Sequence, residues 1–149
     1  MHKSPFLSSI YDEMMCRRYA KRTIETYLHW IKGYIVFHNK QHPNLLGNSD
    51  VEAYLDYLVL KRNVAGPTQA LVLNALSFLY KEILKAPLSV ELKFVKSQKP
   101  RKLPVVLTRD EMGALLAHIN SNYYLPAALM YGSGLRLMET VRLRVQDID

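Results

Sequence analysis

The sequence predicts an all-α protein, and three features of its 149 residues support this. Apolar residues recur three and four positions apart, which is the spacing of one buried helix face. Proline, glycine and capping residues separate these stretches, as expected at helix ends. Hydrophobic residues make up 49% of the chain, so it carries enough apolar surface to build a core.

Two helices are predicted within residues 6–39. The residues that predict a short first helix are Phe6, Leu7, Ile10 and Met14. A second helix is expected over 23–39, because Thr23 is a suitable N-cap and Pro43 prevents its continuation. The apolar stripe of this helix comprises Ile24, Tyr27, Leu28, Ile31 and Ile35.

Two further helices are predicted before residue 88. Residues 48–50 (Asn-Ser-Asp) form a capping sequence for the third, and residues 66–68 (Gly-Pro-Thr) mark the start of the fourth. Their apolar stripes are Val51, Tyr54, Leu55 and Leu58, and Val72, Ala75, Leu76, Leu79, Tyr80 and Ile83. Four short amphipathic helices in one segment predict a compact helical bundle.

The helical pattern breaks over residues 86–105, which contain three prolines and a run of basic residues. Thr108 and Glu111 then form a capping box for a helix whose apolar residues are Met112, Leu115, Leu116 and Ile119. Pro126 is expected in the first turn of the next helix. We therefore expect a helical domain over 1–88, a basic linker over 89–106 and the start of a second domain over 107–149.

The charge of the chain favours a polyanionic partner. Its net charge is +7, and the segment 93–102 holds five Lys or Arg residues and no acid. The start of the chain does not resemble a signal peptide, and charged residues interrupt every long apolar stretch. The single cysteine, Cys16, excludes an internal disulfide framework. These features predict a cytoplasmic protein without a membrane partner.

A turn followed by an arginine forms the most informative motif. The helical run that ends near Met130 meets Gly132-Ser133-Gly134, and a new helix then begins with Arg136 in its first turn. Backbone amides and a guanidinium at such a helix start suit an oxyanion or a phosphate. Glu139 lies one turn further on, where it can orient Arg136 or pair with Arg142.

This motif resembles the Gly-Leu-Arg-x-x-Glu box of tyrosine recombinases, in which the arginine is the first of two that clamp the scissile phosphate. The match extends from Met130 to Asp149 and ends in Arg-Leu-Arg-Val-Gln-Asp-Ile-Asp. Four more segments, in the same order, resemble integron integrases, a subgroup of this family: 27–31, 37–40, 76–84 and 101–111.

The resemblance implies a four-helix core-binding (SAM-like) domain followed by the first helices of a truncated catalytic domain. The family exchanges DNA strands through a 3′-phosphotyrosyl bond, without a metal or nucleotide cofactor. Its lysine, His-x-x-Arg box, later His or Trp and nucleophilic tyrosine all follow the arginine box, and this chain stops thirteen residues past Arg136. We therefore expect DNA binding without catalysis in a bacterial cytoplasm, with Arg136 and a supporting Glu139 as an incomplete catalytic site.

By resemblance, the DNA substrates are an integron attachment site and folded cassette recombination sites. The basic cluster at residues 17–23 corresponds to a region that lies on the DNA backbone in the family's core-binding domains. The start of the fourth helix, Lys81 and the basic linker are further candidates. The expected DNA-binding residues are Arg18, Lys21, Arg22, Thr23, Thr68, Gln69, Lys81, Lys99, Arg101 and Lys102.

Two other readings stand beside this one. A helix-turn-helix regulator would need a polar recognition helix, and the fourth helix is too apolar to fit well. A truncated integrase could also act as an interaction module, either as a homodimer or by docking on intact protomers and inhibiting them. His38 and His42 are four residues apart but lie at a helix end without a third ligand, so no metal site is expected.

Overall fold

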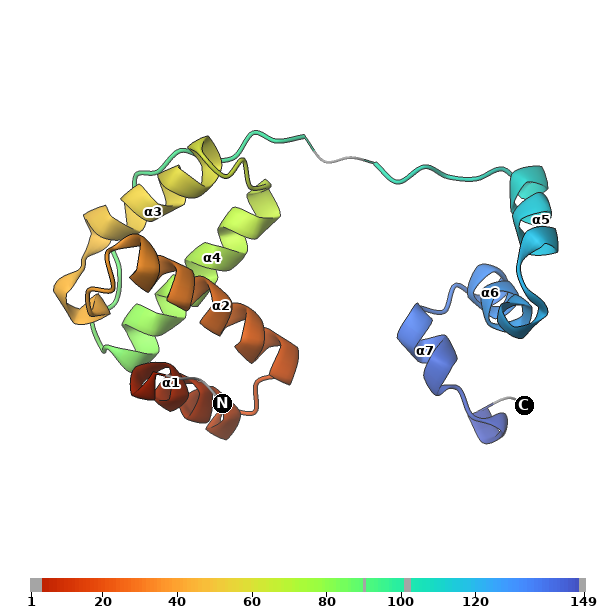
Figure 1. The fold of residues 1–149 in the computed structure, drawn as a ribbon, viewed down its shortest axis with the longest axis horizontal. Coiled ribbons are helices and arrows are strands. Elements are labelled where there is room, and N and C mark those ends of the chain that lie inside the picture. Colours follow the sequence, from red (N-terminus) through yellow and green to blue (C-terminus); the bar gives the residue numbers. More distant parts are fainter. Residues whose placement is uncertain (1–3, 90, 101–102, 148–149) are drawn as a thin grey trace. The chain divides into compact units, whose positions relative to one another are not determined.

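The computed structural model describes residues 4–89, 91–100 and 103–147. These residues form seven α-helices and short 3-10 and π segments, and they contain no strand. The chain divides into two compact units, Met1–Arg101 and Lys102–Asp149 (Figure 1). The all-α class expected from the sequence is therefore confirmed.

Four α-helices build the first unit: α1 (Pro5–Cys16), α2 (Lys21–Phe37), α3 (Asn48–Leu60) and α4 (Gly66–Phe78). A 3-10 turn, η1 (Pro43–Leu45), precedes α3, and a π-helical segment, η2 (Leu79–Ile83), continues α4. Helix α2 packs on α1 and α4, and α4 also packs on α3 (Figure 1). The two central helices α2 and α4 thus carry most of the packing.

The apolar stripes expected from the sequence meet in one core. Ile10, Ile24, Val51 and Leu76, one from each helix, are fully buried. The hydroxyl of Tyr34 lies 2.8 Å from that of Tyr80, which also lies 3.4 Å from the Pro43 carbonyl oxygen, so the buried phenols have partners. The other large buried apolar side chains of this core are Leu7, Met14, Leu28, Ile31, Leu46, Tyr54, Leu55, Leu58, Val72, Phe78 and Leu79.

Two helix starts differ from the sequence expectation. Helix α2 begins at Lys21, with Ala20 as its N-cap, and the amide of Thr23 already donates to the Ala20 carbonyl at 2.8 Å. Thr23 therefore lies inside the helix and is not its cap. Helix α3 begins at Asn48, and the Asp50 carboxylate accepts the amide of Gly47 at 2.8 Å. The expected capping sequence is used here, although the N-cap residue is Gly47.

Residues 87–99, which we call the strap, lie along the first unit and are described except for residue 90. The side chains of Leu88, Leu92 and Phe94 pack against the core. Backbone amides of the strap bond to side chains of α3 and to Gln69 of α4. Much of the segment expected to be a linker is thus held on the first unit.

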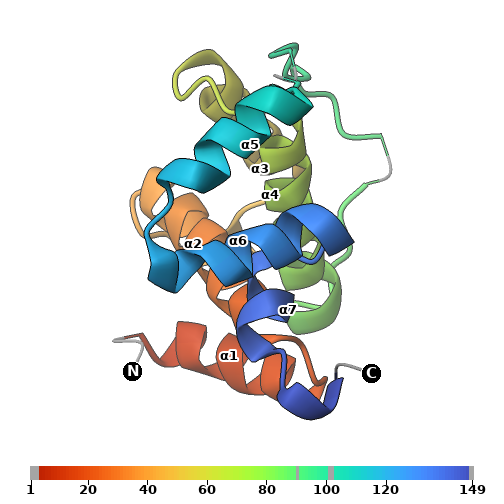
Figure 2. The ribbon, with the colours of Figure 1, turned by 90° about the vertical axis from the view of Figure 1, so that its right-hand side faces the viewer.

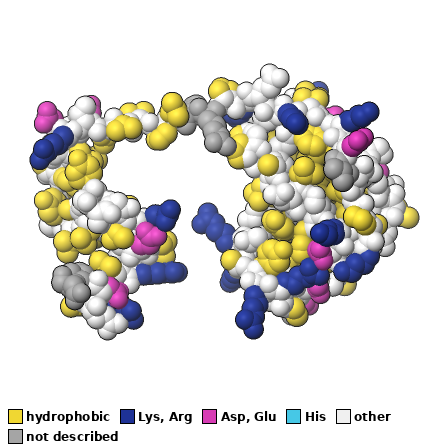
Figure 3. Space-filling model, turned by 180° about the vertical axis from the view of Figure 1, so that it is seen from behind, with side chains coloured by type: hydrophobic (Ala, Val, Ile, Leu, Met, Phe, Trp, Pro, Cys, Tyr) yellow, Lys and Arg dark blue, Asp and Glu magenta, His cyan; other side chains and the backbone are white. Residues whose placement is uncertain are grey.

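The second unit contains α5 (Arg109–His118), α6 (Ser121–Ser133), α7 (Leu137–Arg142) and the 3-10 turn η3 (Val145–Asp147) (Figure 2). Thr140 is the only buried residue among those described in this unit. Large apolar side chains are exposed instead, and many are visible in Figure 3. Those at least half exposed in the helices and η3 are Tyr123, Tyr124, Leu125, Tyr131, Leu137, Met138, Val141 and Val145.

The expected position of Pro126 in the first turn of a helix is wrong. Helix α6 begins earlier, at Ser121, and Pro126 lies inside it. The reason is the N-cap Asn120, whose side-chain oxygen accepts the amide of Asn122 at 3.0 Å. Proline has no amide proton, so this helix lacks one internal hydrogen bond at Pro126. The helix ends at Gly134, which has a φ of 70° and serves as its C-cap.

Candidate nucleic-acid interface

Basic side chains surround the corner between α1 and α2. Arg18 is exposed and has a φ of 59°, so it forms the left-handed turn that ends α1. Lys21 and Arg22 are exposed in the first turn of α2, which contains no acidic residue. Two cations at the positive, N-terminal end of a helix dipole are repelled by that dipole, and a bound anion would relieve the repulsion. The corner is therefore electrostatically suited to a phosphate group.

An aromatic cluster connects this corner to the end of α4. The ring centroid of Phe78 lies 5.6 Å from that of Tyr19 and 6.0 Å from that of Tyr27. Phe78 is the last residue of α4, and the exposed Lys81 follows it in η2. The cluster therefore fixes the α1–α2 corner on the element that carries Lys81.

Arg17 ties α1 to the same place. Its guanidinium donates to the carboxylates of Glu13 at 2.8 Å and Glu82 at 2.7 Å, and it lies 5.8 Å from the ring centroid of Phe78. The hydrogen bond from Arg17 holds the pKa of the Glu82 carboxyl below its usual value. Since Arg17 is engaged in these contacts, its role is to support the basic corner.

Three other expected DNA-binding residues, Thr68, Gln69 and Lys99, lie at the opposite end of α4. Thr68 is partly buried in the first turn of α4, about 20 Å from Lys81 at the usual helical rise per residue. The Lys99 ammonium donates to the Asn63 carbonyl at 3.1 Å, just before this helix start. The expected residues that the structure describes therefore do not form one patch. Arg101 and Lys102 lie outside the described residues.

Gln69 differs from its expected role at the surface. Its side chain is only 4% exposed, and its amide bonds to the strap through both the nitrogen and the oxygen. With one donor and one acceptor bonded to the strap and the residue nearly buried, Gln69 holds the strap in place, and its contact with DNA stays a prediction. The apolar spacing of α4 could not reveal this, because Gln69 is polar and its partners are more than twenty residues away.

An uncharged face of α4 lies between its two ends. Ala70 and Asn74 are exposed, and Ser77 is partly buried. Lys and Arg side chains in Figure 3 gather mainly at the upper and lower ends of the first unit, with few charged groups between them. This arrangement suits a partner with two rows of phosphates separated by an uncharged region.

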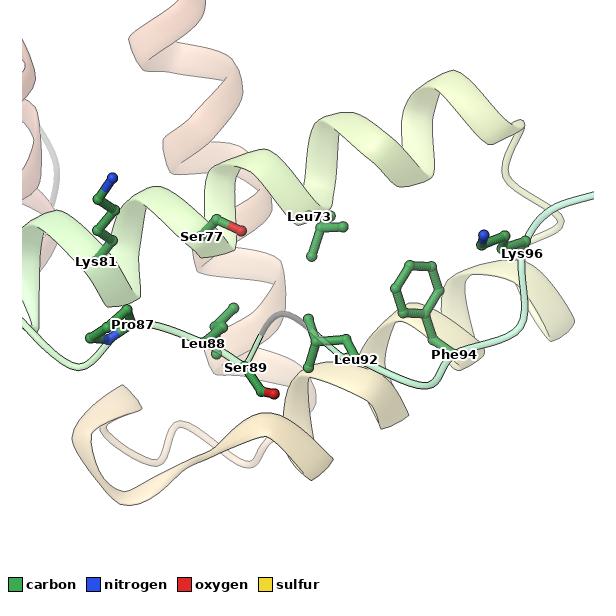
Figure 4. A pocket seen from close by; sticks show the side chains of 9 residues that line it. All are labelled: Leu73, Ser77, Lys81, Pro87, Leu88, Ser89, Leu92, Phe94 and Lys96. Atoms are coloured by element: carbon green, nitrogen blue, oxygen red, sulfur yellow. The ribbon is translucent and has the colours of Figure 1, made fainter.

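A groove runs between α4 and the strap, with a volume of about 550 Å³. Figure 4 shows Leu73 and Ser77 on its α4 side and Leu88, Leu92 and Phe94 on its strap side. Lys81 and Lys96 stand at its two ends (Figure 4). The groove therefore has an apolar floor with a cation at each end.

Arg136 and Glu139 form a compact pair at the start of α7. The Glu139 carboxylate accepts both the backbone amide of Arg136, at 2.8 Å, and its guanidinium, at 3.1 Å. The sequence left two partners open for Glu139, Arg136 and Arg142, and the structure shows the pairing with Arg136. The Arg136 side chain is 86% exposed, so its remaining donors are free to reach an anion.

Neither histidine of the 38–42 pair forms part of a metal site in the described residues. His38 lies 3.1 Å from the Asp50 carbonyl oxygen, and His42 accepts the amide of Asn44 at 3.3 Å. Within the described part of the chain, His, Cys, Asp and Glu form no group of three or more that could hold a metal ion. No helix in that part of the chain is long and apolar enough to span a membrane.

Sequence reasoning missed the polar side chains that hold the strap. Asn48, Glu52 and Asp56 lie four residues apart on α3, so they share one face of the helix. They accept backbone amides of Ser89, Lys93 and Val95. Their regular spacing beside the apolar stripe was a visible signal, but such a face is usually solvated.

Residues 6–90 match the N-terminal SAM-like domain of phage integrases. The chain therefore belongs to the phage integrase family, the tyrosine recombinases. This agrees with the four-helix first unit and with the Gly-Leu-Arg box, and it confirms the family expected from the sequence.

Related proteins align with nearly the whole chain. An integrase/recombinase of Escherichia coli is 37% identical over 143 residues, which cover 96% of this chain and 42% of the relative. A tyrosine recombinase of Thermosipho africanus is 28% identical over 144 residues, covering 89% of this chain and 50% of the relative. The crystal structure of XerA recombinase aligns with a TM-score of 0.53 and 26% identity, covering 97% of this chain and 51% of that one. The chain thus spans about half the length of these proteins.

Proposed function

We propose that this chain is the DNA-binding N-terminal portion of a site-specific tyrosine recombinase that acts in DNA integration and recombination. The observation that carries the proposal is the basic corner of the first unit. Lys21 and Arg22 stand exposed at an acid-free helix start, and an aromatic cluster connects them to the element that carries Lys81. Such a surface suits phosphate contacts.

We assign the chain to the integron integrase kind within this family. Support comes from the segments 27–31, 37–40, 76–84 and 101–111, which resemble that subgroup in residue type and order. The proposed substrates are an integron attachment site and cassette recombination sites, recognised in the bacterial cytoplasm. No cofactor is needed for this role.

Arg136 is proposed as one of two arginines that clamp the scissile phosphate, with Glu139 holding it in place. A guanidinium fork can neutralise charge on non-bridging oxygens during phosphoryl transfer. The 149 residues contain no tyrosine after Arg136, where the family has its nucleophile. We therefore expect these residues to bind DNA without forming a covalent intermediate.

The proposal is tested by measuring the DNA affinity of the full chain against salt concentration. If the chain neutralises roughly five phosphates, the logarithm of affinity falls with a slope of about −4.5 against the logarithm of salt. The Lys21→Ala/Arg22→Ala variant is expected to flatten this slope by about 2 units. Fluorescence anisotropy with a labelled duplex gives both values.

A matched control removes the same charge from Lys32, in the second half of α2, and from Lys40, three residues past its end. The Lys32→Ala/Lys40→Ala variant is expected to keep the parent slope, because neither residue lies at the basic corner. Equal slopes for the two double variants would count against the corner as the DNA contact. A parent chain with no salt-dependent binding would count against the function itself.

A second candidate function is that of an interaction or inhibitory module. The observation in its favour is the exposed apolar surface of the second unit, including Leu125, Leu137 and Val141. Its partner would be a second copy of the chain or an intact recombinase protomer. A chain that sediments as a monomer at every concentration, and that leaves strand exchange by an intact recombinase unchanged, would exclude this role.

A further inference from the structure

The strap is held on α3 by a row of side-chain acceptors. Asn48, Glu52 and Asp56 are spaced four residues apart along one face of this helix. Their oxygens accept the backbone amides of Ser89 at 3.1 Å, Lys93 at 2.6 Å and Val95 at 2.6 Å. An extended segment usually forms its backbone hydrogen bonds with a neighbouring strand. Here the side chains of α3 take the place of that strand.

Gln69 completes this arrangement from α4. Its amide nitrogen donates to the Val95 carbonyl at 2.7 Å, and its amide oxygen accepts the Ser97 amide at 3.0 Å. A primary amide carries a donor and an acceptor side by side, so it can pair with a backbone as another peptide does. Because the Gln69 side chain is only 4% exposed, this pairing is shielded from water.

The alternation of bonded amides sets the directions of the strap side chains. The amides of Lys93, Val95 and Ser97 are bonded, and successive side chains of an extended segment point to opposite faces. Leu92 and Phe94 pack inward on the core, whereas Lys93 lies exposed on the other face. Lys96 shares the face of Phe94 and is exposed at the end of the groove, and Lys99 is exposed beyond it. A change in the path of the strap would therefore redirect its lysines.

We propose that Glu52, Asp56 and Gln69 are positioning residues that lock the strap, and that the lock holds Lys93, Lys96 and Lys99 as an ordered cationic row along the length of the strap, on both of its faces, for DNA phosphates. This inference rests on the proposed DNA-binding function. An ordered row is already in its binding conformation, so DNA does not have to order the segment on binding. The two acids thus favour DNA binding through hydrogen bonds, although their charge alone opposes it.

A charge-matched pair of variants separates these two effects. Glu52→Gln/Asp56→Asn and Glu52→Ala/Asp56→Ala both remove two negative charges. Only the first pair keeps a carbonyl oxygen that can accept the amides of Lys93 and Val95. Gln69→Met, which keeps the side-chain size but lacks the amide, tests the lock from α4.

The lock itself is tested by hydrogen exchange in the full chain without DNA. Exchange at Lys93 and Val95 is expected to be about tenfold faster in the double Ala variant than in the Gln/Asn variant. Gln69→Met is expected to raise exchange at Ser97 by a similar factor. Equal exchange in the two double variants, with the parent helix content retained, would overturn the lock.

The lysine row is tested by anisotropy with a labelled duplex across salt concentrations. The double Ala variant is expected to show a salt slope about 2 units flatter than the Gln/Asn variant of equal charge. Faster exchange with equal slopes would overturn the link between the lock and DNA. A parent chain that does not bind DNA would overturn the proposed function and the lysine row, while exchange would still decide whether the lock exists.

Discussion

At the scale of single residues, Gly33 in α2 is a position where packing opposes helix propensity. Alanine is favoured over glycine inside a helix by about 1 kcal/mol. A Cβ at Gly33 would, however, stand 2.6 Å from the Tyr54 hydroxyl oxygen, which belongs to a side chain only 3% exposed. We expect Gly33→Ala to lower the free energy of unfolding by about 1–3 kcal/mol, because the buried Tyr54 ring cannot move freely.

Tyr54→Phe provides the control for this prediction. Without the hydroxyl, the nearest Tyr54 atom is Cζ, 3.8 Å from the added Cβ, which is an ordinary contact. Gly33→Ala should then become neutral or stabilising in the Tyr54→Phe background. Urea unfolding of the four proteins in this double-mutant cycle measures the coupling, and additive effects would refute the clash.

The burial and the partners of single residues could be predicted from the sequence to different extents. The buried positions of Ile24, Leu55 and Leu76 follow from helical spacing, and the structure confirms them. The pairing of Glu139 with Arg136 was one of two alternatives, since both possible partners lie three residues away. The contact of Arg17 with Glu82 joins residues 65 positions apart, so local spacing could not indicate it.

At the scale of elements, buried tyrosines join α2, η1 and η2 and make stability sensitive to alkaline pH. Burial and the hydrogen bond to Tyr80 raise the pKa of Tyr34, and burial raises the pKa of Tyr54 to about 12. Their contribution is fully present below the unfolded-state pKa of about 10 and is lost as pH rises towards the folded-state values. We expect the free energy of unfolding to fall between pH 10 and 12 by about 1.4 kcal/mol per pH unit for each such tyrosine.

The measurement is urea unfolding of the parent and Tyr34→Phe between about pH 8 and 12. Tyr34→Phe removes one titrating phenol, so its stability should depend less steeply on pH than that of the parent. Tyr80 can keep its contact with the Pro43 carbonyl in this variant. A parent stability that stays constant up to the top of this range would contradict the assignment of these pKa shifts.

The presence of each helix was easier to predict from the sequence than the residue at which it begins. The helices expected before residue 88 are all present, because long apolar stripes dominate local preferences. The helix starts depended on which residue serves as the N-cap. Ala20 is the N-cap of α2 in place of Thr23, and the N-cap Asn120 places the start of α6 ahead of Pro126. The strap was expected within a linker, since its partners come from distant helices and its own sequence has no helical spacing.

At the scale of the whole molecule, the two units differ in how they are stabilised. The first unit has a single buried core, whereas the second has one buried residue among those described. The candidate DNA contacts also separate into groups at the two ends of α4, which the linear order of basic residues did not indicate. The family could be identified from local motifs, but this division required the three-dimensional arrangement.

The central claim is that these 149 residues bind recombination-site DNA without forming a covalent bond to it. The direct measurement uses a duplex nicked near the cleavage position, incubated with about 10 μM protein and analysed on native and SDS gels. We predict a retarded complex on the native gel that is absent from the SDS gel. Free DNA on both gels, or a protein–DNA band that survives SDS, would contradict the claim.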